Sequence, residues 1–223
     1  ALPVTKIFDS YVNDLRKPGS GNALLFDYTQ FEFLEIGNGW DQSGSFSFET
    51  WVKRTSTAIT DPDAQVFIAS VNTGGWAVGI NQNAGAGPVG AIFLSKVGIS
   101  QVSSSATISD INWHHVAVTY NAGTNQVVFY IDGVAEAPVS YSPGGFNSGN
   151  TSYRLGGRYA PAGNALDGWL EETRIWSAVV LTETHVRDWM CRKLSSSHSS
   201  FSALTGYFRY DEGSGTTAGG YNA

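Results

Sequence analysis

The chain has 223 residues, enough for one large domain or two small ones. A chain of this length can bury a core that is stable without cross-links. Only 14% of residues are charged, the formal net charge is −6, and no basic run is present to neutralise phosphates, which argues against a nucleic-acid partner. No apolar stretch approaches the roughly 20 residues of a membrane span, so no membrane insertion is expected. A single cysteine excludes an internal disulfide and a cysteine-based zinc site.

Short segments of alternating apolar and polar residues recur along the chain between clusters of Gly, Asn, Ser and Pro. Such segments predict strands at 46–53, 65–71, 75–81, 90–97, 113–120, 126–131, 153–155, 170–176 and 204–211. Their spacing is typical of an all-β sandwich. Strands do not alternate with long helices along the chain, which argues against a parallel sheet. The side chains expected to point into the core are Phe46, Phe48, Val116, Val118, Val127, Phe129 and Ile131.

One helix is predicted, over 183–193. Thr182 is a suitable N-cap, Glu183 lies in the expected first turn, and Arg192 and Lys193 lie in the expected last turn, where their charges suit the helix dipole. Apolar residues recur at helical spacing between them. The following stretch, 195–200, reads as a polar loop before a last strand.

Five motifs occur in order along the chain: NALLFD at 22–27, FSFETWV at 46–52, WHHVAVTY at 113–120 with FYIDG at 129–133, LDGWLEETRIW at 166–176, and YFRYDEGSG at 207–215. Together they resemble laminin-G-like domains of the concanavalin A-like lectin/glucanase superfamily, of the type found in bacterial multidomain surface proteins. The resemblance implies a jelly-roll β-sandwich of two antiparallel sheets with one short C-terminal helix. We expect a single domain over 1–215 and a linker-like tail over 216–223.

Domains of this kind often hold a calcium ion, which carboxylates and backbone carbonyls bind. The resemblance brings the first and last motifs close together, so the implied calcium ligands are Asp27, Glu32 and Asp167. Tyr28 departs from the Gly of the family pattern, and the stretch 29–34 is one residue longer than usual. The alternative is that Asp27 and Asp167 form hydrogen bonds within turns.

Laminarinases and alginate lyases share this fold, so an enzyme must be considered. A retaining glycosidase needs two carboxyl groups about 5–5.5 Å apart. Glu171 and Glu172 are adjacent, so on a regular strand they point to opposite faces. Glu49 and Glu172 meet only if their strands are neighbours, and Lys53 and Arg174 would then pair with them. With neither a zinc spacing nor a nucleophile elbow in the sequence, we expect no catalysis.

A ligand is expected on one rim of the sandwich, where loops combine aromatic rings with amides and carboxylates. The expected contacts are Trp40, Asp41, Tyr159 and Asn164. We therefore predict a non-catalytic module that recognises a carbohydrate or a surface protein, for adhesion or substrate targeting. It would be extracellular or on the cell surface, in a longer multidomain chain. The alternatives are a structural spacer without its own ligand, and a polysaccharide-degrading jelly-roll enzyme.

Overall fold

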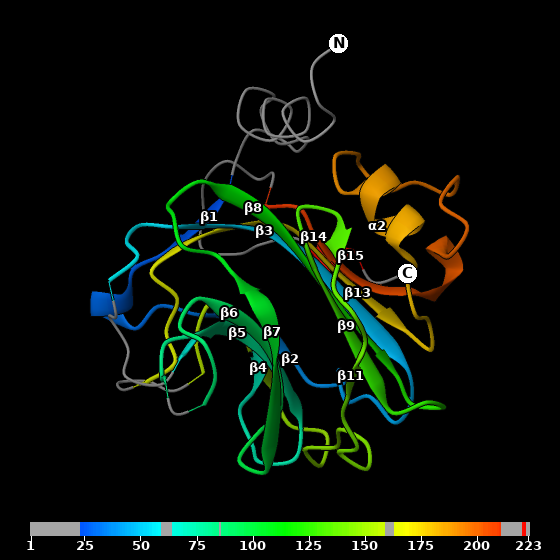
Figure 1. The fold of residues 1–223 in the computed structure, drawn as a ribbon, viewed down its shortest axis with the longest axis horizontal. Helices are drawn as coiled ribbons and strands as arrows, with labels where there is room; N and C mark the ends of the chain where they lie inside the picture. The colour runs from blue at the N-terminus through cyan, green and yellow to red at the C-terminus, as the bar shows by residue number, and fades with distance from the viewer. Residues whose placement is uncertain (1–22, 59–63, 85, 159–162, 211–219, 222–223) are drawn as a thin grey trace.

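The computed structural model describes residues 23–58, 64–84, 86–158, 163–210 and 220–221. They form two facing antiparallel sheets, so the predicted jelly-roll sandwich is confirmed (Figure 1). The larger sheet runs β10-β9-β8-β3-β13-β14-β15, with β1 beside β13 and β11 beside β9. The smaller sheet runs β2-β12-β4-β5-β6-β7.

The larger sheet contains β1 (Leu24–Phe26), β3 (Phe46–Arg54), β8 (Trp113–Asn121), β9 (Gln126–Ile131), β10 (Val134–Ala135), β11 (Val139–Ser140), β13 (Gly168–Ser177), β14 (Leu204–Phe208) and β15 (Gly220–Tyr221). The smaller sheet contains β2 (Leu34–Gly37), β4 (Ala64–Ser70), β5 (Trp76–Asn81), β6 (Ala91–Lys96), β7 (Ser100–Thr107) and β12 (Tyr153–Leu155). The helical segments are η1 (Tyr28–Gln30), α2 (Glu183–Trp189) and η2 (Phe201–Ala203).

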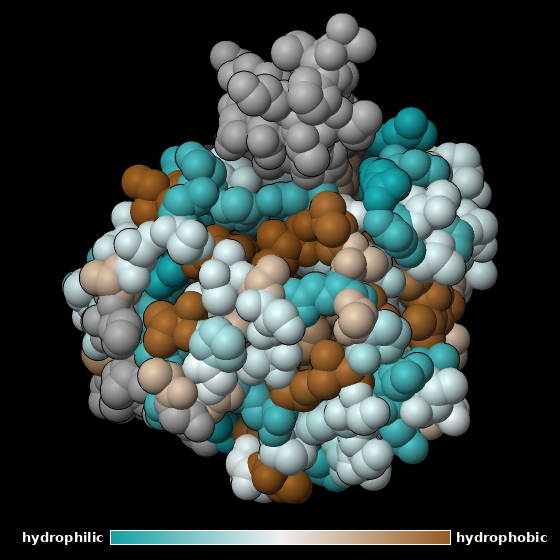
Figure 2. All heavy atoms as spheres, in the orientation of Figure 1, coloured by the Kyte–Doolittle hydropathy of each residue, from teal (hydrophilic) through white to brown (hydrophobic). Residues whose placement is uncertain are grey.

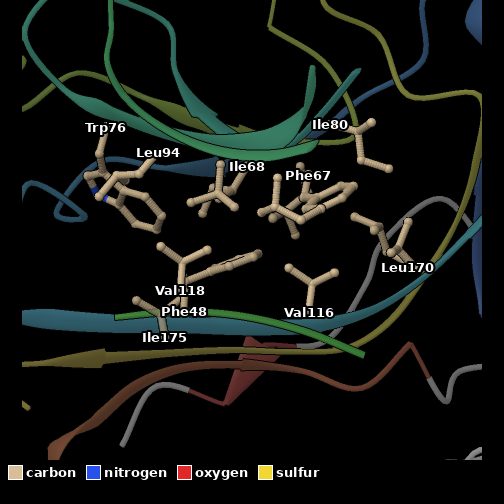
Figure 3. Close-up of a cluster of buried hydrophobic side chains, with 14 of the residues drawn as sticks. Phe48, Phe67, Ile68, Trp76, Ile80, Leu94, Val116, Val118, Leu170 and Ile175 are labelled. Carbon is tan, nitrogen blue, oxygen red and sulfur yellow. The ribbon is translucent and has the colours of Figure 1, made fainter. Parts of the chain in front are cut away.

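The core lies between the two sheets, where side chains from both meet (Figure 3). All seven residues predicted to point inward belong to this cluster; six are fully buried, and Ile131 is partly buried against it. Trp76, at one end of the cluster drawn in Figure 3, is fully buried, and its Nε1 donates to the backbone oxygen of Trp40 at 2.7 Å. On the face seen in Figure 2, apolar side chains form separate patches between polar ones.

Helix α2 lies on the outer face of the larger sheet (Figure 1). It begins at the predicted cap: Thr182 accepts a hydrogen bond from the backbone N–H of His185, whose side chain accepts one from Thr182 in return. It ends at Trp189, short of the predicted end at residue 193, and its last basic residue is Arg187. At its C-terminal end, the backbone oxygen of Trp189 accepts a hydrogen bond from Arg174, and that of Met190 accepts one from Trp51. These bonds fix this end of the helix on the sheet.

Strand β13 contains a β-bulge that overturns the prediction for its two glutamates. The pairing with β3 shifts between Glu171 and Arg174, and Glu172 has a positive φ of 52°. Glu171 lies opposite Trp51 on the outer face, and Glu172 bonds to Arg174 on that same face. An extra residue in one strand breaks the period of two. The adjacent glutamates therefore share one face, where a regular strand would separate them.

Strand β7 forms one edge of the smaller sheet, and a carboxylate from elsewhere in the chain covers part of it. Glu136 accepts hydrogen bonds from the backbone N–H of Ser105 at 2.8 Å and of Ala106 at 2.6 Å. These groups belong to an edge strand, which would otherwise present unpaired donors to solvent.

Candidate functional site

A groove lies on the outer face of the smaller sheet, away from the core. Val78, Ile80 and Leu94 point into the core, so the residues that alternate with them on β5 and β6 point outward. The groove has a volume of about 220 Å³. Its lining residues are Ala64, Val66, Ala77, Asn81, Asn83, Ala86, Phe93, Ser95, Val97, Gly98, Gln101, Arg158 and Asn164.

The floor of the groove is apolar and its rim is polar. The floor residues Val66, Ala77 and Phe93 form a buried cluster distinct from the main core. The exposed rim carries the amides of Asn83, which follows β5, and of Gln101 on β7. A hollow with a few convergent polar groups is the usual composition of a small-ligand site. The floor residues Val66, Ala77 and Phe93 are only 2–3% exposed, so a sugar would meet mainly the polar rim, whose groups match its hydroxyls.

The rim is held to the sheet by specific hydrogen bonds. The side-chain nitrogen of Asn81 donates to the backbone oxygens of Asn83, Gly87 and Pro88 at 2.9, 2.8 and 3.1 Å, which fixes the loop after β5. On the other side, Arg158 donates from Nε to the backbone oxygen of Ser70 at 3.1 Å. Both walls of the groove are thus tied to strands, which favours a preformed site.

Of the three predicted ligand contacts that lie in the described residues, only Asn164 lines this groove. Its φ of 61° lies in the left-handed region that Asn tolerates, and its backbone oxygen accepts from Val66 N–H at 3.4 Å. Tyr159 lies outside the described residues. The Trp40 ring is only 7% exposed and packs against Phe208, with 5.8 Å between ring centres. This burial leaves the ring no open face, so Trp40 has no part in the site proposed below.

Asp41 lies apart from the groove and holds a neighbouring loop. Its carboxylate accepts hydrogen bonds from the backbone and hydroxyl of Ser148 at 3.0 and 2.6 Å, from Asn150 N–H at 2.9 Å and from the Tyr153 hydroxyl at 2.9 Å. Burial acts to raise the pKa of Asp41, but these hydrogen bonds outweigh it and hold the pKa below its ordinary value. The four bonds account for Asp41 as a structural residue.

The predicted calcium ligands are brought close together, but their oxygens are used within the chain. Phe26 pairs with Gly168, which places Asp27 beside Asp167. Asp27 accepts hydrogen bonds from Thr29, Glu32 accepts one from the backbone of Asp27, and Asp167 accepts one from the Thr55 hydroxyl. Within the described part of the chain, no cluster of three or more acidic, His or Cys side chains is arranged to hold a metal ion. As arranged, these three carboxylates do not fit a calcium site, and calcium stays a prediction.

A second polar cluster is buried between the larger sheet and α2. Arg174 Nη1 lies 2.6 Å from Glu49 Oε1, and Nη2 lies 2.8 Å from Glu172 Oε2, which also accepts from the Tyr207 hydroxyl. All three charged side chains are about 1% exposed. Despite burial, the two carboxylates keep the pKa of Arg174 above its ordinary value. The predicted meeting of Glu49, Glu172 and Arg174 on one face is confirmed, and it forms an ion-pair cluster.

The adjacent histidines of β8 lie in different surroundings. His115 is 1% exposed on the outer face, and burial holds its pKa well below the ordinary value. His114 lies at the rim of the sandwich, with Nδ1 2.8 Å from Asp132 and Nε2 2.9 Å from Asp110. Burial acts to lower the pKa of His114, but the two carboxylates raise it to about 9. His114 is therefore a charged clamp between two loops.

Residues 27–187 match the family model described as the concanavalin A-like lectin/glucanases superfamily. Because this match spans well over half of the chain, the protein belongs to that superfamily. The comparison with curated proteins found no match.

Several solved structures share the fold. A proposed carbohydrate-binding protein from Bacteroides ovatus superposes with a TM-score of 0.69 at 19% identity, over 91% of this chain and 54% of that one. This chain thus spans about half the length of that relative. A second similar structure is domain 4 of AbnA, a GH43 extracellular arabinanase from Geobacillus stearothermophilus, solved in complex with arabinotriose. Its TM-score is 0.57 at 18% identity, over 76% of each chain. A SAP-like pentraxin from Limulus polyphemus superposes with a TM-score of 0.51 at 12% identity, over 77% of this chain and 78% of the pentraxin. At these identities the likeness concerns the fold.

Proposed function

We propose that this domain is a non-catalytic carbohydrate-recognition module and that the groove on the smaller sheet binds the glycan. The observation that carries the proposal is the hollow of about 220 Å³ whose exposed rim carries the amides of Asn83 and Gln101. Amides both donate and accept hydrogen bonds, so they match sugar hydroxyls, which do the same. The B. ovatus protein and the arabinanase domain support this proposal, since their descriptions name carbohydrate binding or a bound arabinotriose.

The test is a glycan array followed by titration calorimetry on the best glycan. The variant Gln101→Ala/Asn164→Gly removes two rim amides, and Gly suits the left-handed backbone at 164. We expect this variant to bind about tenfold more weakly or worse, roughly 1.4 kcal/mol. Gln30→Ala, an exposed amide on η1 away from the groove, is the matched control and should bind like the parent. Equal binding by all three proteins would place the site elsewhere, and binding of no glycan at all would favour a spacer or a protein-binding module.

The proposal includes no catalysis, because the carboxylates that meet on one face are covered. Glu49, Glu171 and Glu172 are at most 1% exposed, beneath α2 and the residues that follow it. A substrate would have to displace this helix to reach them. Cleavage of laminarin, alginate or agar by the purified protein, abolished in Glu49→Gln, would overturn this part of the proposal.

A serine–histidine contact on the surface also fails as a nucleophile pair. The Ser199 hydroxyl lies 3.0 Å from His185 Nε2, while His185 Nδ1 accepts the backbone N–H of Thr182 at 3.3 Å. Because Nδ1 is the acceptor, the neutral ring carries its proton on Nε2 and donates it to Ser199. A general base needs the opposite tautomer.

We further propose that the domain acts outside the cell, in a secreted or surface protein where it targets or attaches a longer chain to its glycan. The arabinanase whose domain 4 shares this fold is extracellular, which supports this setting. No helix in the described ranges is long and apolar enough to cross a bilayer. Fractionation of the producing cells, with an antibody against this domain, checks the proposal; recovery from the cytosol alone would contradict it.

A further inference from the structure

A row of side chains crosses the outer face of the larger sheet at the end of its central strands. Four residues lie directly opposite one another in register: Leu25 on β1 pairs with Trp169 on β13, Trp169 pairs with Lys53 on β3, and Lys53 pairs with Trp113 on β8. Directly opposed residues of an antiparallel pair share a face. We call these four residues the indole row.

The indole row lies just beyond the cover that α2 provides. One step along the same strands, Trp51 is 1% exposed, and its Nε1 donates to the backbone oxygen of Met190 at 2.7 Å. In the row itself both indoles and Lys53 are half-buried, and Leu25 is 47% exposed. The row is therefore a partly open surface with two large rings.

The spacing of the two rings suits an extended polymer. Trp113 and Trp169 are separated by β3, and two strand spacings amount to roughly 9.6 Å between their backbones. Alternate rings of a flat β-1,4-linked polysaccharide repeat over a comparable length. Lys53 lies between the indoles in register, and its Nζ lies over the Trp169 ring, 5.4 Å from the ring centre. A bound chain would have to move this ammonium aside to stack on Trp169, and the ammonium would then donate to a sugar hydroxyl.

The charges around the row favour a neutral polymer. Lys53 contributes the positive charge of the row, but one step further along β13 and β1 lie Asp167 and Asp27. A polyanion would be attracted by Lys53 and repelled by the two carboxylates. A neutral chain meets neither effect, and its hydroxyls can donate hydrogen bonds to the carboxylates. The surface thus offers stacking and hydrogen bonding without a strong field of either sign.

We propose that the indole row is a second glycan site, which takes an extended neutral β-1,4-linked chain along its two indoles. It lies on the opposite outer face of the sandwich from the groove, so one domain holds two glycan segments. This site does not depend on the proposed function of the groove, because no residue is shared between them.

The test measures retention of the full chain on microcrystalline cellulose and on crystalline chitin. We expect the parent to be retained by at least one polymer and Trp113→Ala/Trp169→Ala to bind at least about tenfold more weakly. The groove variant Gln101→Ala/Asn164→Gly should be retained like the parent. Retention of the parent by neither polymer, equal retention of the double Ala variant, or loss only in the groove variant would each overturn the proposal.

A second variant guards against misfolding. Trp113→Phe/Trp169→Phe keeps an aromatic ring at each position, so the expected retention is intermediate between the parent and the Ala variant. Intrinsic fluorescence gives an independent readout: cellohexaose or chitohexaose should shift the emission of the parent, and the Phe variant should lose this shift. An unchanged shift in the Phe variant would assign the signal to other tryptophans and refute the row as the site.

Discussion

Replacing Arg174 by methionine should be among the most destabilising single changes in this domain. Arg174 bonds to Glu49 and Glu172 and also donates to the backbone oxygens of Trp189 and Arg192. Met keeps much of the volume but leaves two buried carboxylates without their cation. Removing one partner of a buried ion pair typically costs about 3–5 kcal/mol, and we expect that loss in the free energy of unfolding.

The assay is equilibrium unfolding in urea, followed by tryptophan fluorescence. The matched control is Arg187→Met, because Arg187 pairs with Glu183 on the exposed side of α2, with the two side chains 55% and 44% exposed. That change should cost about 0.3–0.5 kcal/mol. The triple variant Glu49→Gln/Glu172→Gln/Arg174→Met should regain much of the lost stability because no uncompensated charge remains. A cost for Arg174→Met below about 1 kcal/mol, or equal to the control, would refute this account of the cluster.

Three further outcomes are expected. The pKa of His114 is raised to about 9, so its contacts with the two carboxylates stabilise the fold fully below pH 6.5. The free energy of unfolding should fall between pH 6.5 and 9 by at most about 3 kcal/mol. His114→Gln should flatten this pH dependence in urea titrations. Because Thr29 and Thr55 use the carboxylates of the predicted calcium site, we expect a chelator to leave the melting temperature unchanged; a rise with calcium that Asp27→Asn abolishes would instead support the ion. Gly156→Ala should lower the melting temperature by several degrees, because the added Cβ would lie 2.1 Å from a ring carbon of Phe26 at a φ of +76°; an unchanged value would contradict the packing there.

Much of the fold could be predicted because most strands bury one face and alternate cleanly. The strands at 126–131 and 153–155 begin and end where the alternation predicts. Strand β7 was missed because its residues, Ser-Gln-Val-Ser-Ser-Ser-Ala-Thr, lack an apolar period. An edge strand that is mostly exposed needs no such period, so local pattern carries no signal for it.

The bulge in β13 shows where parity arguments fail. A period of two predicts that Glu171 and Glu172 separate, and only the register against β3 shows that they do not. Leu170 and Ile175 both belong to the core although five positions separate them, which a regular strand forbids. These two apolar residues were the signal in the sequence that could have revealed the irregularity.

The groove was only partly predictable. Asn164 was selected as a loop amide, but the floor residues were not, because outward-facing Ala77 and Phe93 read as ordinary strand residues. The available signal was that β4 is apolar on both faces, which marks an outer face that is covered or hollowed. Trp40 was selected because a tryptophan after a Gly-rich turn suggests an exposed loop residue, whereas contacts distant in sequence leave it 7% exposed.

The carboxylate of Glu136 over the edge of β7 bears on how this domain behaves when it is crowded. Copies concentrated on a surface, or joined in tandem, meet edge to edge, and an open edge invites intermolecular strand addition and fibril growth. A side chain that accepts the N–H groups of Ser105 and Ala106 occupies the donors that an incoming strand would need. Glu136, in a connecting loop far in sequence from β7, thus protects this part of the edge against strand addition.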